Sequence, residues 1–343
     1  MKRLIRSMAP LRLGLGGGSS DLAPFVRRYG GEVLNATINK CVHATLVPND
    51  SDQILLRSED YGITREYDSS KALPYDDELD LVCAVINRVR GTKEYNVPKS
   101  GFDIYLRSDA PPGAGLGTSS TVVVAILGLF NEWCNIHMGN YQLAHLAWEI
   151  ERVDMKMAGG KQDQYSAVFG GFNLMYFRQN DEVLIVPLKV PRSTLLELQN
   201  NLLLVYSGKT HKSGEIIMSQ TPNSLEKFNW ILHIKNIAQA MVEDLLAKDL
   251  ENFGELLSME WLYKKRLSSK TSNEYLEKLA NAAMEAGSIG LKITGAGGGG
   301  MFLIYCPWRK RTHIANTMKK QGCKVIDYSF RVKGLQTWSV KYG

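Results

Sequence analysis

A run of glycines and hydroxyl side chains near the middle of the chain is the segment best suited to chemistry. After Pro111 the glycines alternate with other residues, and a run of hydroxyl side chains follows them. Glycines let the backbone turn its N–H groups inward, because no Cβ stands in the way. The hydroxyls begin an expected helix, whose N-terminus carries about half a positive charge. The segment therefore predicts a polyphosphate site made by Pro112, Gly113, Ala114, Gly115, Leu116, Gly117, Thr118, Ser119 and Ser120.

This run differs from a Walker loop, which places Gly-Lys-Ser/Thr after its glycines. No lysine occurs here, so other groups must balance the phosphate charge. The hydroxyls of residues 118–120 can serve as Mg²⁺ ligands. A glycine hinge followed by a Ser/Thr helix cap is the alternative interpretation.

Charged side chains accompany two further segments. An N-terminal glycine cluster lies between Arg12 and Asp21, which could equally be a surface ion pair. Glu151 lies on an expected helix, and Asp163 follows the glycines of residues 159–160. Carboxylates this close together can serve a metal ion and a substrate hydroxyl. A solvated helix end is the alternative for this second segment.

A third glycine cluster, residues 295–300, matches G-x-G-x-x-G by letter. It precedes an apolar, strand-like run, whereas a dinucleotide-binding loop precedes a helix. A dinucleotide site is therefore disfavoured. A glycine loop between two strands can still approach a ligand closely, and we include Gly297 and Gly298 among the candidate substrate contacts.

The composition narrows the class of protein. The chain has 343 residues, a length that suits two domains. Its net charge of +6 is compatible with a phosphorylated small-molecule ligand. Its five cysteines are widely spaced, and its histidines lack metal-ligand spacing, so we expect no structural metal site and a cytoplasmic location. No apolar run reaches the ~20 residues that span a bilayer, and no secretory signal is apparent. The basic runs at residues 263–266 and 308–311 are interpreted as solvated surface, with no nucleic-acid partner.

These candidate residues must be positioned by alternating strands and helices. In the first half we expect strands at residues 5–15, 42–47, 53–57, 103–106 and 172–177, and helices at 119–132 and 141–154. In the second half we expect helices at 225–248, 251–263 and 273–285. The strands expected there are 202–206, 292–294, 301–305 and 325–331. A boundary near residue 188 divides the chain into domains 1–188 and 189–343.

The order of the three glycine segments resembles the GHMP kinases, the superfamily of galactokinase, homoserine kinase and mevalonate kinase. The resemblance implies an α+β fold with an N-terminal ATP-binding domain, a ferredoxin-like C-terminal domain and an active site between them. Within the family, the chain is most similar to the sugar 1-kinases, particularly those that act on heptose phosphates. Galactokinases have Glu-His before the aspartate of the first segment, where this chain has Gly18-Ser19-Ser20, so galactose is disfavoured. Mevalonate kinases carry a lysine near the position of Arg12, which disfavours an isoprenoid.

The resemblance also implies roles for individual residues. Asp163 corresponds to the catalytic aspartate that orients and deprotonates the attacked hydroxyl, and Arg12 to the basic residue beside the γ-phosphate. Ser119 and Glu151 match the pair that holds Mg²⁺. The sugar is expected at Gly17, Gly18, Ser19 and Asp21.

A phosphate on the sugar would need its own cationic site. Lys209, Thr210 and Lys212 are the candidates, although they could be an ordinary polar loop. The expected partners are ATP and a sugar phosphate, with the chain a monomer or homodimer. Another sugar kinase, for fucose or an N-acetylhexosamine, stays open, as does a regulator that binds ATP and sugar without turnover.

Overall fold

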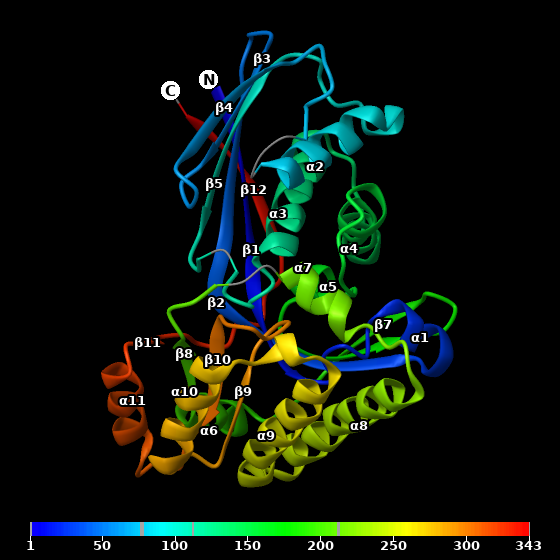
Figure 1. Cartoon of the computed structure of the whole chain (residues 1–343). Coiled ribbons are helices and arrows are strands. Elements are labelled where there is room, and N and C mark those ends of the chain that lie inside the picture. The colour runs from blue at the N-terminus through cyan, green and yellow to red at the C-terminus, as the bar shows by residue number, and fades with distance from the viewer. Residues whose placement is uncertain (1, 76–78, 112, 211–212, 343) are drawn as a thin grey trace.

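The computed structural model describes residues 2–75, 79–111, 113–210 and 213–342. In that part of the chain the strands form two sheets, one of eight strands and one of four, joined by helices (Figure 1). The mixture of helices and sheets is the α+β arrangement expected from the sequence. None of the helices described is both long and apolar enough to cross a membrane.

The large sheet is built around two long antiparallel strands, β1 and β2, and its order is β12-β1-β2-β5-β3-β4. At its lower end β2 also pairs with β6, and β6 pairs with β7. Only β3 and β5 run parallel among the described pairs. The strands are β1 (Lys2–Gly16), β2 (Gly31–Pro48), β3 (Gln53–Ser58), β4 (Ile63–Asp68), β5 (Phe102–Ser108), β6 (Phe172–Phe177), β7 (Val183–Pro187) and β12 (Gln336–Tyr342).

One face of the large sheet is covered by helices, among which α3 packs directly on β1 and β2 (Figure 1). Residues Val123 to Phe130 of α3 are all buried, because an apolar helix lies between the sheet and its neighbours. Gly128 allows β12 to approach, since a Cβ there would lie 3.1 Å from the Thr337 side chain. The helices of this half are α1 (Ala23–Tyr29), α2 (Asp80–Gly91), α3 (Thr118–Trp133), α4 (Asn140–Glu149) and α5 (Gln162–Phe169).

The small sheet is antiparallel and has the order β11-β8-β10-β9. Helices connect β8 to β9 and β10 to β11, whereas β9 and β10 are adjacent in the sequence. This is the ferredoxin-like order expected for the C-terminal half. Its strands are β8 (Leu202–Tyr206), β9 (Gly290–Ile293), β10 (Met301–Tyr305) and β11 (Lys324–Ile326). Its helices are α6 (Arg192–Asn201), α7 (Ser213–Gln220), α8 (Leu225–Ala247), α9 (Leu250–Leu267), α10 (Glu274–Glu285) and α11 (Arg311–Lys320).

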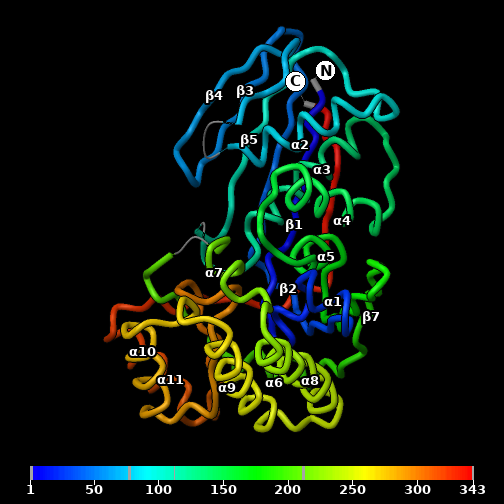
Figure 2. The backbone as a smooth tube through the Cα atoms, turned by 45° about the vertical axis from the view of Figure 1, so that its right-hand side comes forward, coloured from blue at the N-terminus to red at the C-terminus, as the bar shows by residue number. Residues whose placement is uncertain are grey.

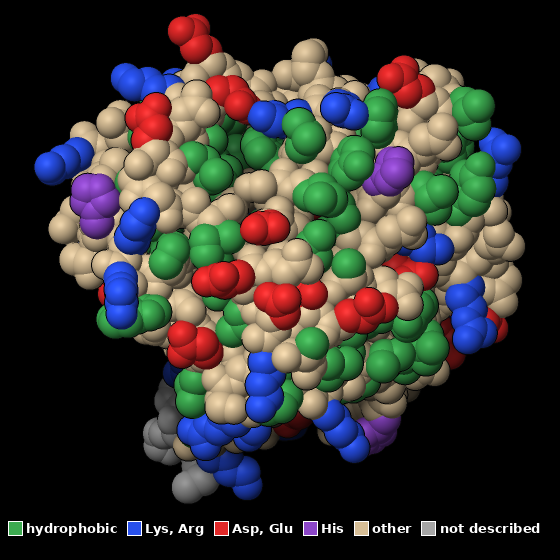
Figure 3. Space-filling view, turned by 90° about the horizontal axis from the view of Figure 1, so that it is seen from below, with side chains coloured by type: hydrophobic (Ala, Val, Ile, Leu, Met, Phe, Trp, Pro, Cys, Tyr) green, Lys and Arg blue, Asp and Glu red, His purple; other side chains and the backbone are tan. Residues whose placement is uncertain are grey.

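Polar caps explain where two of these helices begin. Asp249 accepts a hydrogen bond from the backbone of Asn252 at the start of α9, and Asn273 does the same for Leu276 in α10. Helices α8 and α9 pack side by side below the large sheet (Figure 1). Seen from below, acidic side chains spread across the middle of the surface and most basic ones lie nearer its rim (Figure 3). The positive net charge is therefore not concentrated on this face.

The structure differs from the expectations in several places. The helix expected at 141–154 ends at Glu149 and continues as a π-helical turn, Ile150–Asp154. The strand expected at 325–331 ends at Ile326, because the chain then bonds to the long strand β2: the backbone N–H of Arg331 donates to Thr37. Strand β12 was not expected, and it returns to the N-terminal sheet beside β1 (Figure 2). The boundary near residue 188 stays a prediction.

Candidate functional site

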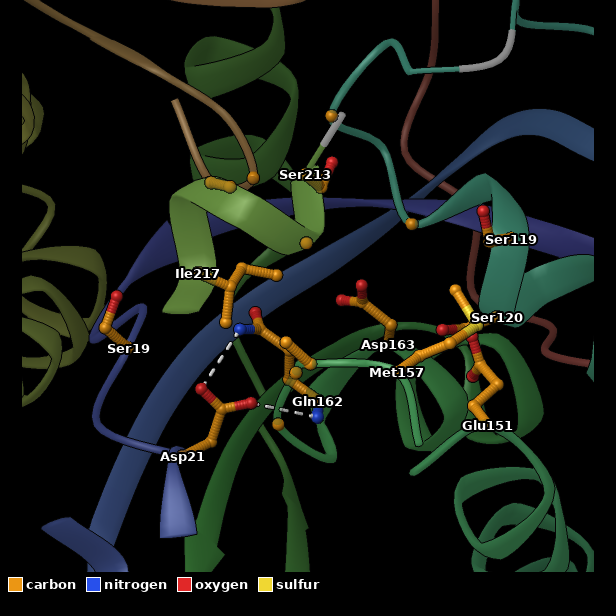
Figure 4. Close-up of a pocket in the computed structure, with 18 of the residues that line it drawn as sticks. Ser19, Asp21, Ser119, Ser120, Glu151, Met157, Gln162, Asp163, Ser213 and Ile217 are labelled. Carbon is orange, nitrogen blue, oxygen red and sulfur yellow. Dashed lines mark hydrogen bonds between the residues drawn. The ribbon is translucent and has the colours of Figure 1, made fainter. Parts of the chain in front are cut away.

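A cavity of about 260 Å³ lies where the lower ends of β1 and α3 meet α5, α7 and the turn before β10. Both halves of the chain line it (Figure 4). The predicted site residues that line it are Arg12, Ser19, Asp21, Gly113, Ala114, Gly115, Gly117, Thr118, Ser119, Ser120, Glu151 and Asp163. The structure thus brings together groups from three distant segments of the sequence.

The central glycine loop has the backbone that its sequence predicts. Gly113, Gly115 and Gly117 have φ angles of 71°, 78° and 77°, in the left-handed region that favours glycine. Gly117 directly precedes α3, and no side chain caps that helix. The first N–H groups of α3 are therefore left for a ligand at its N-terminus, as a phosphate site requires. The alternative interpretation, a Ser/Thr side chain that caps this helix, is therefore wrong.

The third glycine cluster supports this loop from behind. The backbone N–H of Met301 donates to the carbonyl of Ala114 over 3.0 Å. A Cβ on Gly115 would lie 2.6 Å from the carbonyl oxygen of Thr294, and one on Gly295 would lie 2.9 Å from Gly115. Two glycine backbones therefore pack against each other, and the C-terminal half fixes the position of the central loop.

Arg12 connects the loop to Asp163. Its Nε donates to Asp163 Oδ1 over 2.7 Å, and its Nη1 donates to the carbonyl of Gly115 over 2.7 Å. The Arg12 side chain is 6% exposed and that of Asp163 is 22% exposed. A bulge in β1 between Pro10 and Arg12 changes the register at this point. A buried guanidinium thus holds the Asp163 carboxylate. That carboxylate stays open to the cavity (Figure 4).

Asp21 lies across the cavity from the helix α3 (Figure 4). Its carboxylate accepts hydrogen bonds from the backbone N–H of Gln162 at 3.2 Å and from the side chain of Gln162 at 3.3 Å. Burial raises the pKa of the Asp21 carboxyl, and the Gln162 backbone hydrogen bond opposes this rise. Only a glycine fits at position 160, because a Cβ there would overlap Asp21 Oδ2. Gln162 therefore fixes the orientation in which Asp21 could accept from hydroxyl groups.

Glu151 is almost fully buried in the π-helical turn after α4. Burial raises the pKa of its carboxyl, and the charge of Arg152 opposes the rise. One oxygen, Oε2, accepts a hydrogen bond from the Gln164 side chain. The other, Oε1, is buried without a hydrogen-bond partner in the described residues, as is the hydroxyl of Thr118. Buried oxygens without partners are what a hard cation requires as ligands.

These oxygens fit a magnesium ion that keeps most of its other ligands as water or phosphate. The described residues include no cluster of three His, Cys, Asp or Glu side chains that could enclose a metal. Ser119 lines the cavity with an exposed side chain, whereas Ser120 is buried and accepts from Gln164 over 3.1 Å. The residues present therefore suit a weakly held ion shared with a ligand.

Other predicted residues do not reach the cavity. Lys209 and Thr210 are exposed, and the Lys209 ammonium lies 4.4 Å from the centre of the Tyr275 ring. Leu116, Gly17 and Gly18 are not among the residues that line the cavity. Leu116 is buried at 1% exposure, and a Cβ on Gly17 would overlap the carbonyl of Glu32. Pro112 and Lys212 lie outside the described residues.

The cluster at residues 295–300 contributes different residues from those predicted. Gly295 and Ala296 line the cavity. Gly297 packs against Thr271, and the N–H of Gly298 donates to the Thr271 carbonyl. These two glycines therefore hold the loop in place and do not contact the cavity.

Sequence reasoning missed Lys264, which it assigned to a solvated basic run. The residue is 4% exposed and lines the cavity from α9. The available signal was helical spacing: Leu257 and Trp261, seven and three residues earlier, are buried on the same face. Sequence reasoning also missed Ile217 and Gln220, which line the cavity from α7.

Comparison with known proteins agrees with this geometry. The chain matches the GHMP kinases N terminal domain over residues 80–171 and the GHMP kinases C terminal domain over residues 241–322. It is 35% identical to the D-glycero-alpha-D-manno-heptose 7-phosphate kinase of Campylobacter jejuni, over 98% of this chain and 100% of that protein.

Solved structures with the same fold cover nearly the whole chain. A D-glycero-D-manno-heptose 1-phosphate kinase from Bacteroides thetaiotaomicron is 34% identical, with a TM-score of 0.84 over 98% of this chain and 100% of its own. Lactococcus lactis galactokinase is 17% identical, with a TM-score of 0.79 over 97% of this chain and 95% of its own, and so shares the fold. The chain, with its glycine loop at the start of α3 and its two-domain architecture, belongs to the GHMP kinases, a family of ATP-dependent phosphotransferases.

Proposed function

We propose that this kinase transfers the γ-phosphate of ATP to the anomeric hydroxyl of D-glycero-D-manno-heptose 7-phosphate. The product would be the 1,7-bisphosphate, a precursor of GDP-heptose for surface polysaccharide. The proposed location of the enzyme is the cytoplasm. The identity of 35% over the full length of the Campylobacter heptose phosphate kinase supports the choice of sugar. The observation that carries the chemistry is the Arg12–Asp163 pair beside the loop that precedes α3.

Asp163 is the residue proposed to orient the sugar hydroxyl and to accept its proton. An aspartate is a weak base near neutral pH, since its ordinary pKa is about 3.9. Two features of the reaction reduce this difficulty. An anomeric hydroxyl is more acidic than an ordinary alcohol, and phosphoryl transfer passes through a loose transition state, so the proton can leave late.

Arg12 is proposed to stabilise charge on the transferring phosphoryl group. Its guanidinium already contacts both Asp163 and the Gly115 carbonyl, so it lies between the base and the phosphate loop. A fixed cation at that point stabilises the transition state without reorganisation during the reaction. The N-terminus of α3 supports the same role, because its free N–H groups and helix dipole favour phosphate oxygens.

Glu151 and Ser119 are the proposed protein ligands of Mg²⁺. Glu151 Oε1 supports this assignment, because it accepts no hydrogen bond within the described residues and its nearest cation, Arg152 Nη1, is 3.9 Å away. The ion would neutralise charge on the β- and γ-phosphates. Across the cavity, Asp21 is proposed to accept hydrogen bonds from sugar hydroxyls in the orientation that Gln162 imposes. Ser19 lines the same side; its hydroxyl donates to Gln220 Oε1 over 3.3 Å, and its oxygen is left to accept from a sugar hydroxyl.

The experiment that tests this function is a panel of acceptors in an ADP-release assay. The panel holds heptose 7-phosphate, unphosphorylated heptose, fucose, an N-acetylhexosamine and mevalonate. We expect the highest kcat/KM with heptose 7-phosphate, and a phosphorus resonance coupled to the anomeric proton in the product. A higher kcat/KM with fucose or an N-acetylhexosamine would transfer the assignment to that sugar. ATP binding without turnover of any acceptor would indicate a regulator.

A further inference from the structure

Lys264 is a buried cation in the wall of the cavity that the mechanism above does not use. It projects from α9 and is 4% exposed. Its Nζ donates to the carbonyl of Gly295 and lies 3.4 Å from where a Cβ on Gly18 would stand. The absence of a side chain at Gly18 therefore gives the ammonium group its place beside the first glycine cluster, on the Asp21 side of the cavity.

The other cations around Lys264 already have partners. Arg12 pairs with Asp163, and Arg152 donates to backbone carbonyls of residues 158 and 160. Beneath the cavity, Lys292 Nζ lies 2.7 Å from Glu260 Oε2 and also donates to the carbonyl of Leu15. Each of these cations has its charge or its donors satisfied within the protein.

Lys264 differs, because within the described residues no carboxylate oxygen lies within 4.0 Å of its Nζ. Glu260, one turn away, is bound instead by Lys292 and by the N–H of Gly18. Burying a cation without a counter-ion is costly, and burial lowers the pKa of the Lys264 ammonium to about 8. An ammonium has three donors, and one is used by Gly295, so two are left for a ligand in the cavity.

We propose that Lys264 is the anion-binding residue of the sugar subsite and pairs with the phosphate that the sugar substrate already carries. This proposal rests on the function proposed above and names the group that recognises a phosphorylated acceptor. A dianionic phosphate supplies the missing counter-charge, whereas a neutral hydroxyl would leave the ammonium without one. In this proposal Lys264, and not the exposed loop of Lys209 and Thr210, supplies the positive charge that binds the phosphate of the sugar.

The proposal predicts that Lys264 discriminates between phosphorylated and unphosphorylated forms of one sugar. We compare wild type with Lys264→Met on heptose 7-phosphate and on unphosphorylated heptose. The variant should lose roughly 100-fold in kcat/KM on the sugar phosphate and little on the neutral sugar. Lys265→Met is the matched control, since Lys265 pairs with Glu277 outside the cavity, and it should leave both values within about twofold.

Each possible result has a distinct meaning. Equal losses on both sugars, or no loss on either, would overturn the assignment of Lys264 while leaving the proposed reaction in place. A wild type that uses neutral sugars better than heptose 7-phosphate would overturn the proposed function itself.

A measurement on wild type alone covers the case in which Lys264→Met fails to fold. Lys292, Glu260, Arg12 and Asp21 are the charged groups that act on Lys264 from α9, β1, β9 and the turn after β1. The ammonium loses its proton near pH 8, so kcat/KM for heptose 7-phosphate should fall above that pH. The value for neutral heptose should not fall in parallel. Parallel profiles would contradict the proposal.

Discussion

The guanidinium of Arg12 and the carboxylate of Asp163 are 2.7 Å apart in space and 151 residues apart in sequence. Arg12 also donates to the carbonyl of Gly115 in the loop before α3. One side chain therefore sets the distance between the proposed base and the proposed phosphate site. Because both of its contacts are buried or half-buried, Arg12 is held in place before any ligand arrives.

Replacing Asp163 with Asn should remove transfer and leave nucleotide binding intact. We expect kcat to fall by about 10²- to 10⁴-fold, because the amide cannot accept the proton of the hydroxyl. The Kd for ATP, measured by calorimetry, should change by less than about threefold. Asp50→Asn, at an exposed position after β2, is the control and should retain full activity. Full activity in Asp163→Asn would rule out the assignment of the base.

Glu151→Gln should raise the concentration of Mg²⁺ needed for half-maximal activity by at least about tenfold, since a neutral amide is a poor ligand for a hard cation. Ser119→Ala should shift the same titration in the same direction. Ser70→Ala is the matched control, because Ser70 is exposed in the turn after β4, where its hydroxyl donates to Asp68 Oδ1. An unchanged magnesium titration in both Glu151→Gln and Ser119→Ala would place the ion elsewhere.

Gly115→Ala should raise the KM for ATP by about 10- to 100-fold, because the new Cβ would lie 2.6 Å from the Thr294 carbonyl and displace the loop. Strain at positive φ adds roughly 1–2 kcal/mol. Gly208→Ala separates the two effects: its φ is also positive, at 81°, but no atom lies within 4 Å of the added Cβ. That control should lose stability and keep its KM for ATP. Equal changes in KM would contradict the packing argument.

Glu260→Gln should lower the free energy of unfolding by about 3–5 kcal/mol, because it leaves Lys292 charged and buried without its partner. Urea unfolding followed by tryptophan fluorescence measures the change. Glu182→Gln breaks an ion pair with Arg178 in which both side chains are more than half exposed, and it should cost less than about 1 kcal/mol. If the two variants lose equal stability, the buried pair does not hold α9 and β9 to β1.

Lys264 should give the protein an unusual dependence of stability on pH. Its folded-state pKa of about 8 lies below the unfolded value of 10.5, so between these pH values the unfolded chain binds more protons. Stability from this group is therefore lowest below pH 8 and rises as the pH increases from about 8 to 10.5. The difference in unfolding free energy between wild type and Lys264→Met should rise over that window. A flat difference would show that Lys264 titrates normally.

Local features of the site could be predicted because their signal lies in adjacent residues. Gly113, Gly115 and Gly117 turn the loop through their own conformational freedom, and α3 follows as an apolar run. The roles of Asp163 and Arg12 came from resemblance, and the structure brings the two side chains together in the cavity, while their catalytic roles stay predictions.

Features that depend on distant pairing could not be predicted in this way. Lys264 belongs to a basic run that is typical of a surface; helical spacing places it on the buried face of α9, but only the packing of α9 against the first glycine cluster brings it to the cavity. Lys209 has the right chemistry for a phosphate contact. In the structure, however, the Lys209 ammonium lies over the ring of Tyr275. Strand β12 alternates polar and apolar residues, and its partner β1 lies at the other end of the sequence.

The position of β12 has a consequence for the order in which the chain can be assembled on a ribosome. Strand β1 precedes the whole C-terminal sheet in the sequence and β12 follows it, so one edge of β1 stays open until β12 has emerged. The Leu335 and Thr337 side chains that pack on Gly128 of α3 arrive at the same late moment. Helix α3 therefore reaches its final packing only after β12 has emerged, and a nascent chain that stalls before β12 should expose an unpaired strand edge to chaperones.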